Sequence, residues 1–449
     1  GLGYGSQENG FRTPTYPLFI AAILLPFKHA DLSSCREARV PACLGEAQQE
    51  PSAQANLRAI VAVQILFGTL TILLVYWFAW KITQQAWVAA LCAFTYPIDL
   101  STGYWEISVL TDTLTTFLLM LTACLTLLAA EARRYRGALH AALGVVLGAL
   151  ALCHSVYLLY AIVPAAFLWL HQRQSGRHQP NSDDYSRHQN QPGSDDFSRH
   201  PLHLAFVLVI PAVFVLAWSA RNYRVDGYFT PSTISGYNLT QMVGPFMEQA
   251  PPSYRDLANI YLDYRADRIA IRGSHSGTIF FAYRDMLSER GTTWAGLSQM
   301  LTAMSLQMIA QHPQDYARVF WQSFVQFWKF GLGRQNYQLP ISFDWVKWFL
   351  DTRVHDAWMA LFFITPLALA LLQFTRRSET SAVVWIWFAI FTVLYAALFS
   401  SAFNFGDNER YRTHVARLQY SAVIATAWLL LQAVTARLET FKNKDRSIV

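Results

Sequence analysis

The stretch IVAVQILFGTLTILLVYWFAW, residues 60–80, contains no charged side chain. About 20 consecutive apolar residues are enough for an α-helix to cross a hydrocarbon core of roughly 30 Å. Lipid offers no hydrogen-bond partner to the backbone, so a lipid-facing segment has to satisfy its own N–H and C=O groups as a helix. The stretch, which belongs to an apolar run over 57–80, therefore predicts a transmembrane helix.

Similar apolar runs recur along the whole chain of 449 residues, of which 53% are hydrophobic and only 14% are charged. An ordinary soluble domain carries about 25% charged residues. The further runs cover 86–98, 110–130, 138–153, 156–171, 203–220, 357–374, 382–402 and 416–436. This pattern predicts an all-α, polytopic membrane protein with about nine visible transmembrane helices.

The basic residues distinguish the two sides of the predicted bundle. One set of short loops, with the C-terminal tail, holds Lys81, Arg133, Arg134, Arg136, Arg376, Arg377, Arg437, Lys442, Lys444 and Arg446. The short loops on the other side, near 99–109, 154–155 and 403–415, contain only Arg410 and Arg412. Cytoplasmic loops carry the excess of Lys and Arg, so the first set is predicted to be cytoplasmic. The formal charge of +6 thus reflects topology and does not indicate a nucleic-acid partner.

This sidedness divides the chain into consecutive segments. They are an external loop with a juxtamembrane helix (1–56), transmembrane helices (57–171), a cytoplasmic linker (172–202), a transmembrane helix (203–220), an external cap (221–356), transmembrane helices (357–436) and a cytoplasmic tail (437–449). Because a chain that starts outside needs an earlier crossing, we expect one more span upstream of Gly1.

The linker and the cap have distinctive compositions. In the linker, SDDYSRH at 182–188 recurs as SDDFSRH at 194–200. Its polar character predicts a disordered tract, with a His-rich metal site as the alternative. In the cap, the patterns at 255–273 and 316–330 predict amphipathic helices, the second of them suited to the membrane interface.

The cysteines fall into two groups. Cys92, Cys124 and Cys153 lie inside predicted spans, whereas Cys35 and Cys43 share the first external loop. Since disulfides persist outside the cytoplasm, we predict a bridge between Cys35 and Cys43. The alternative is that both remain free thiols.

Carboxylates at an external membrane mouth are the first candidates for chemistry. The segment DLSTGYWEISVLTDTLTTF, residues 99–117, holds Asp99, Glu106 and Asp112. Ionisable groups at membrane depth are costly and are functional candidates before structural ones. Asp112 and Glu106 are the predicted catalytic carboxylates, since an acceptor hydroxyl needs a group to take its proton. In the alternative interpretation, Thr111 caps the helix and Asp112 stabilises its first turn through the helix dipole.

Arginines on the same external side are the second group of candidates. In NFGDNERYRTHVARLQY, residues 404–420, Arg410 and Arg412 lie at the entrance of the last predicted span. A guanidinium presents a planar fork of donors to phosphate oxygens and stabilises a departing phosphate. We therefore predict that these two side chains bind a donor phosphate, with Arg12 and Arg221 as further candidates. The alternative is that they reach up to lipid headgroups.

Segments in four places, in this order along the chain, resemble motifs of the bacterial dolichyl-phosphate-mannose protein mannosyltransferase-like family, within the GT-C class of polytopic glycosyltransferases. RTPTYPLF at 12–19 resembles R-x-P-G-Y-P-L-F, with Thr15 in the usual Gly position. TDTLTTFLL at 111–119 resembles a Ser/Thr-acid-x-Leu helix start, with Asp112 at the acidic position. RNYRVDGYFTPSTISGYNL at 221–239 resembles the family's R-N loop.

The fourth segment, ERYRTHVARLQY at 409–420, is similar to a terminal R-[FY]-R-x-P motif, although His414 and Val415 stand where a Pro is common. The resemblance covers nearly the whole chain. It implies transfer of a sugar from a polyprenyl-phosphate donor to a lipid, glycan or protein acceptor at the external face of the plasma (inner) membrane. In the family the opening segment is a juxtamembrane helix, and the usual base is an Asp upstream of it, which we expect before Gly1.

The external side shows no cluster of His, Asp and Glu with metal-ligand spacing, so no cofactor is predicted, with a divalent metal as the alternative. A different class of protein, a transporter or flippase for a lipid-linked or anionic solute, would also place Arg at a membrane mouth. Such proteins commonly show internal repeats or broken helices in matching positions, and no such pairing is visible in the sequence. An enzyme is therefore favoured over a transporter.

Overall fold

The computed structural model describes residues 13–25, 51–99, 110–132, 134–177, 200–329, 355–376, 381–406 and 408–446. In these residues every regular element is a helix. The predicted apolar runs form α3 (Pro51–Thr83), α4 (Ala86–Ile98), α6 (Asp112–Glu131), α7 (Arg136–Ala151), α8 (Ile162–Arg177), α9 (His200–Asp226), α16 (His355–Arg376), α17 (Ser381–Phe403) and α18 (Asn408–Arg446). The protein is an all-α, polytopic membrane protein.

The helices of the bundle differ in length. Within the described residues, 7 helices are long and apolar enough to cross a membrane, whereas α4 and α7 have only 13 and 16 residues. At 1.5 Å per residue, α4 rises about 20 Å, which is short of a hydrocarbon core of roughly 30 Å. The prediction of a helix at each apolar run is confirmed, but α4 and α7 by themselves fall short of a full crossing.

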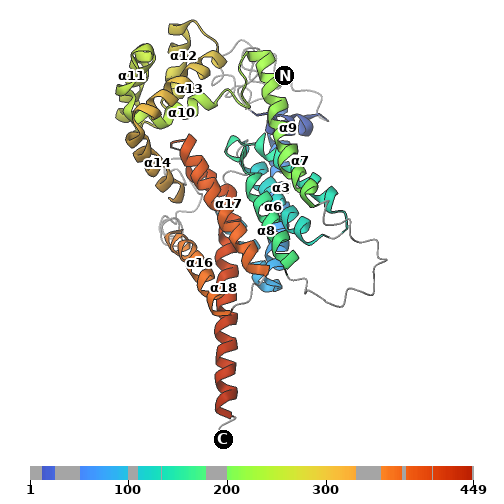
Figure 1. Cartoon of the computed structure of the whole chain (residues 1–449). Coiled ribbons are helices and arrows are strands. Elements are labelled where there is room, and N and C mark those ends of the chain that lie inside the picture. The colour runs from blue at the N-terminus through green and yellow to red at the C-terminus, as the bar shows by residue number, and fades with distance from the viewer. Residues whose placement is uncertain are drawn as a thin grey trace.

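The α-helices between α9 and α16, which we call the cap, are α10 (Ser235–Val243), α11 (Arg255–Arg272), α12 (Ile279–Arg290), α13 (Trp294–Gln311) and α14 (Pro313–Trp328). Helices α10 to α13 gather at one end of the bundle, and the C-terminal end of α18 projects at the opposite end (Figure 1). The helices predicted at 255–273 and 316–330 are confirmed as α11 and α14. Their position relative to a membrane stays a prediction.

The cap has a hydrophobic core of its own, built where α10 crosses α13. The ring of Tyr237 stacks on that of Trp294 with centroids 3.9 Å apart, and its hydroxyl donates to the Trp294 carbonyl at 3.1 Å. Gly236 permits this close crossing, because a Cβ there would lie 2.1 Å from the Ser298 carbonyl oxygen. The cap is therefore a packed unit and not a set of loose loops.

Helix α6 lies inside the bundle, in contact with α3, α7, α8 and α18. Four of its buried threonines direct their hydroxyls to the helix backbone. Thr115, Thr116, Thr122 and Thr126 each donate to the carbonyl four residues earlier, at 2.7 to 2.9 Å. Because these hydroxyls already have partners, they can be buried among apolar neighbours. The first residue of this buried helix is Asp112.

The opening segment forms α1 (Thr15–Leu24), a helix of 10 residues. Its length of about 15 Å is too short for a crossing. The backbone N–H of Thr15 donates to the Leu152 carbonyl at 3.2 Å, and the Tyr16 hydroxyl donates to Oε1 of Gln64 at 3.2 Å. The predicted short helix is thus present and packs on the end of α7 and on α3. Its direction relative to a membrane stays a prediction.

Some predictions concern residues outside the described ranges. They are the Cys35–Cys43 bridge, the character of the linker repeat, and the roles of Arg12 and Glu106. Among the described cysteines, Cys92, Cys124 and Cys153 are buried free thiols, in keeping with their place in apolar helices.

Candidate functional site

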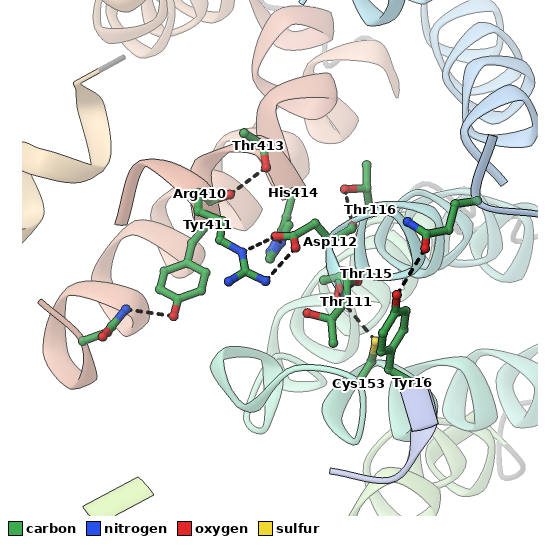
Figure 2. Close-up of polar contacts among 12 residues, drawn as sticks. Tyr16, Thr111, Asp112, Thr115, Thr116, Cys153, Arg410, Tyr411, Thr413 and His414 are labelled. Atoms are coloured by element: carbon green, nitrogen blue, oxygen red, sulfur yellow. Dashed lines mark hydrogen bonds and ion pairs between the residues drawn. The ribbon is translucent and has the colours of Figure 1, made fainter. Parts of the chain in front are cut away.

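Asp112, the first residue of α6, is held by Arg410 from the first turn of α18 (Figure 2). Arg410 donates from Nε to Oδ1 and from Nη2 to Oδ2, both at 2.7 Å. The Asp112 side chain is 2% exposed, whereas that of Arg410 is 19% exposed. Bidentate pairs between a guanidinium and a carboxylate are among the stronger and more directional polar interactions in proteins. This pair fixes the start of α18 against the start of α6.

His414 lies one turn after Arg410 on the same face of α18 and contacts the same carboxylate. Its Nε2 lies 2.9 Å from Oδ1 of Asp112, and its side chain is fully buried. An ionised carboxylate only accepts hydrogen bonds, so Nε2 donates this one. Nδ1 of the same ring lies 3.4 Å from the Tyr157 hydroxyl, in the 3₁₀ turn η2 (Ser155–Tyr157). Asp112 therefore receives hydrogen bonds at both oxygens, and Oδ1 receives two.

Thr111 does not cap α6 through its side chain. Its backbone is helical, with φ −68° and ψ −11°, and it makes no side-chain capping hydrogen bond. A capping residue normally has non-helical backbone angles and accepts from the N–H groups of the first turn. The alternative interpretation that relied on a Thr111 cap is therefore wrong in that part. Asp112 does occupy the first turn, where the helix dipole favours a negative charge.

The segment after α7 forms one wall of the site. The ring of His154 lies 5.3 Å from that of His414 and 5.0 Å from that of Tyr411. The carbonyl of Cys153, the preceding residue, accepts from the hydroxyl of Thr13 at 3.3 Å. The opening motif, the acidic helix start and the terminal arginine motif thus meet at one place in the fold.

The side chains of Arg412 and Arg410 project from different sides of α18. Side chains two residues apart on a helix project about 200° from each other. Arg412 is only 2% exposed and hydrogen-bonds the side chain of Tyr420. The two predicted phosphate ligands are therefore separated, with Arg410 beside Asp112 and Arg412 on another face of the helix.

A second buried ion pair lies further along α18. Arg417 is fully buried and donates to Oδ2 of Asp99 at 2.5 Å and to the Thr95 carbonyl at 2.6 Å. Its guanidinium carbon lies 4.7 Å from the ring centroid of Tyr96 and 5.4 Å from that of Tyr420. Arg417 thus satisfies a carbonyl in the last turn of α4 and binds α4 to α18. Asp99, one of the carboxylates noted in the sequence, has this structural role.

Arg221 lies near the end of α9, where the chain enters the cap. Its Nη1 donates to Oδ1 of Asn222 at 3.0 Å, and its guanidinium carbon lies 4.8 Å from the Trp218 ring centroid. Asn222 in turn donates from Nδ2 to the Thr230 carbonyl at 2.8 Å and so shapes the R-N loop. These contacts give Arg221 a place at the exit of α9. Its role as a phosphate ligand, like that of Arg12, stays a prediction.

Among the described residues, no three His, Cys, Asp or Glu side chains are grouped as a metal site. At the site itself, the carboxylate of Asp112 and the imidazole of His414 bind each other and are completed by Arg410. Of these three side chains, that of Arg410 is the partly exposed one.

In the sequence, His414 stands out only as a departure from a family Pro, and His154 and Tyr157 do not stand out. A spacing of four residues puts Arg410 and His414 on one helix face, which is a signal that they share a partner. No comparable signal marks His154 or Tyr157, since both reach the site through the turn that follows α7.

No protein-family model and no curated protein matches the chain. Similar solved structures include the archaeal oligosaccharyltransferase AglB from Archaeoglobus fulgidus in complex with an inhibitory peptide and a dolichol-phosphate, at 15% identity and a TM-score of 0.45, covering 99% of this chain and 45% of that chain. Another is the oligosaccharyltransferase of the same organism in the apo form, at 14% identity and a TM-score of 0.43, covering 100% and 45% of the two chains. The chain spans less than half the length of these solved chains.

Proposed function

We propose that this protein is a membrane glycosyltransferase that moves a sugar from a polyprenyl-phosphate donor to a lipid, glycan or protein acceptor at the external face of the plasma (inner) membrane. The observation that carries the proposal is the placement of Arg410, the partly exposed member of an otherwise buried site. Both oxygens of Asp112 hold its guanidinium in one orientation. The family-like motifs, three of which meet there, support the same reaction class.

Arg410 is suited to the phosphate of such a donor. Its side chain is 19% exposed, against 2% for Asp112 and 0% for His414, so a ligand that reaches the site meets the guanidinium first. As the glycosidic bond to phosphate breaks, negative charge accumulates on the leaving polyprenyl phosphate, and a preorganised cation stabilises it. Because Asp112 already fixes the guanidinium, little reorganisation is needed as the charge develops.

Asp112 is better placed to orient Arg410 than to act as a general base. A general base must lie within hydrogen-bond reach of the acceptor hydroxyl and must be able to take its proton. Both Asp112 oxygens accept from Arg410, Oδ1 also contacts His414, and the side chain is buried. We therefore assign Asp112 and His414 to positioning, and the base to a carboxylate outside the described residues, with Glu106 as the candidate in this sequence.

In the proposed reaction, the acceptor oxygen forms a bond to the anomeric carbon while the bond from that carbon to the phosphate oxygen breaks. The acceptor proton passes to the base, and polyprenyl phosphate leaves with its negative charge next to Arg410. We place the acceptor on the cap, because the cap lies next to the start of α18. The contact is made by Phe405, which closely precedes α18 and is part of the cap core. Acceptor and donor thus approach the start of α18 from the cap and from the membrane lipids.

A reconstitution assay tests this function. The natural full-length protein is placed in proteoliposomes with a polyprenyl-phosphate sugar labelled in the sugar, with and without lipid, glycan or peptide acceptors. The proposal predicts acceptor-dependent loss of donor and transfer of label. It also predicts that Arg410→Lys reduces both, whereas Arg437→Lys, at an exposed position of the same helix, leaves them unchanged. Movement of labelled lipid across the bilayer without acceptor and without donor loss would instead identify a transporter or flippase.

A further inference from the structure

We propose that Gln241 and Asn404 are positioning residues through which the cap controls the placement of Arg410. The inference rests on the proposed function, in which Arg410 binds the donor phosphate, and it deepens that function by adding the cap as a partner of the site. It is carried by a continuous row of three hydrogen bonds, two of them buried and one part-buried, that runs from the cap to the residue next to Arg410.

The row consists of three hydrogen bonds. The backbone N–H of Gly277 donates to Oε1 of Gln241 at 3.1 Å. Nε2 of Gln241 donates to Oδ1 of Asn404 at 3.2 Å, and Nδ2 of Asn404 donates to the Tyr411 hydroxyl at 2.8 Å. The first two residues belong to the cap, the third to the turn between α17 and α18, and the last to the start of α18. The row therefore ends beside Arg410, as Figure 2 shows for Tyr411.

From Gln241 onward the row is buried, whereas the hydrogen bond from Gly277 is part-buried. The residues Gln241, Asn404 and Tyr411 are 5%, 6% and 8% exposed. A buried polar group that loses its partner is not compensated by solvent and costs its full desolvation free energy. Removal of Gln241 takes away the donor to Oδ1 of Asn404 and the acceptor of the Gly277 N–H, so this side chain links the cap to the turn before α18.

Helix α14 holds the same turn from a second side. The Ser323 hydroxyl donates to the Asn404 carbonyl at 2.6 Å, and Asn408, the first residue of α18, donates from Nδ2 to the Ser323 carbonyl at 2.9 Å. The Tyr316 hydroxyl donates to the Ala402 carbonyl at 2.8 Å. The chain on both sides of the turn is thus bound to the cap.

The cap also lies directly on the turn. Gly406 has φ +110°, a conformation that favours glycine, and a Cβ there would lie 1.8 Å from Oγ of Ser276. The neighbouring ring of Phe405 stacks on that of His275, with centroids 4.6 Å apart. The cap loop that contains Ser276 is therefore in direct contact with the turn.

The two partners of the site are consequently tied to different parts of the protein. Asp112 belongs to α6 inside the bundle, whereas Arg410 lies in the first turn of a helix that starts on the cap. A shift of the cap relative to the bundle changes the two 2.7 Å hydrogen bonds between them. An acceptor bound to the cap is thereby coupled to the donor-phosphate site.

A double-variant comparison tests this coupling. Binding of a polyprenyl phosphate, without sugar or acceptor, is measured for the natural full-length protein, Gln241→Ala, Arg410→Lys and the double variant. Gln241→Ala removes two hydrogen bonds of the row and should weaken binding about fivefold or more. When Arg410 is already replaced, the further loss should be less than about twofold, because the two residues act on one site. An equal fold-loss in both backgrounds would overturn the proposal.

Ser305→Ala is the matched control in the cap. Ser305 is buried, and its Oγ lies 3.4 Å from Oγ1 of Thr240, outside the row. This variant should bind the phosphate as the parent does. A loss equal to that of Gln241→Ala would show general damage to the cap and would count against the proposal. Tyr411→Phe, which removes only a hydroxyl, replaces Gln241→Ala if that variant does not fold, and should weaken binding by the same factor.

Amide hydrogen exchange separates this inference from the proposed function. If the parent does not bind polyprenyl phosphate, the proposed function fails. The positioning role still predicts faster exchange over 408–413 in Gln241→Ala than in Ser305→Ala, because the start of α18 is released from the cap. Equal exchange over these residues in the two variants would overturn the inference itself.

Discussion

Replacement of Arg410 by Lys tests whether the geometry of the guanidinium, and not only its charge, serves the site. Lys offers a compact point charge in place of a planar fork. In the structure, Arg410 donates hydrogen bonds of 2.7 Å to two different oxygens of Asp112, which one ammonium nitrogen cannot reproduce with the same geometry. We expect the cation in Arg410→Lys to lose its fixed orientation toward a phosphate.

The size of the effect follows from the bonds that are lost. A hydrogen bond to a charged group contributes about 1.5–3 kcal/mol, and about 1.4 kcal/mol corresponds to a tenfold change in an equilibrium constant. Because the Arg410 side chain is partly exposed, at 19%, solvent screening favours the lower end of that range. Donor affinity and donor use should therefore fall by about tenfold or more.

The assay is binding of a polyprenyl phosphate to Arg410→Lys, Asp112→Asn and the double variant of the natural full-length protein. Since Asp112 orients Arg410, the losses of binding free energy in the two single variants should not add. The double variant should bind the phosphate only a little more weakly than the single variant with the lower affinity. Arg437→Lys, exposed on the same helix, is the control. Parent-like binding by a folded Arg410→Lys would refute the role of the fork and would move the search to Arg12 and Arg221.

Further outcomes follow from other contacts. His414→Gln should reduce donor use about fivefold, less than Asp112→Asn, because it removes one hydrogen bond from a carboxylate that keeps Arg410; the rate of sugar transfer checks this. Gly406→Ala should destabilise the fold by about 1–3 kcal/mol in thermal unfolding, through backbone strain and the clash with Ser276, and should cost more than Gly227→Ala, where φ is also positive but no atom lies within 4 Å. Burial lowers the pKa of His275, so this residue contributes stability above its ordinary pKa of about 6.5 that is lost as the pH falls toward the lower value; unfolding at several pH values should show the loss, and His275→Gln should reduce it. Finally, an impermeant thiol reagent added outside should label Ser288→Cys in the cap and not Thr440→Cys near the end of α18, and the opposite labelling would reverse the topology.

Most of the helices of the bundle could be predicted, because an apolar segment in lipid has to satisfy its backbone hydrogen bonds as a helix. The run at 86–98 coincides with α4, since the residues on both sides, Gln85 and Asp99, have extended backbone. The 13 residues of the run already show that α4 is short, but the run could not show that Arg417 from α18 donates to a carbonyl in its last turn. That contact depends on tertiary packing between residues far apart in the sequence.

The site could be predicted only in part, for a similar reason. Asp112 and Arg410 stand out singly, because charges at a membrane mouth are costly and call for a partner. Their pairing crosses 298 positions of the chain and becomes visible only when α6 and α18 are packed together. The separation of Arg410 from Arg412 does follow from helix geometry alone, since neighbours two apart cannot share a face.

The most direct test of the central claim is an experimental structure of the natural full-length protein with a polyprenyl phosphate bound. The account predicts that the phosphate lies against the exposed edge of Arg410 while Arg410 keeps its two hydrogen bonds to Asp112. A phosphate bound at a distance from Arg410, with the pair intact and no contact to it, would contradict the account and would leave the pair with a purely structural role.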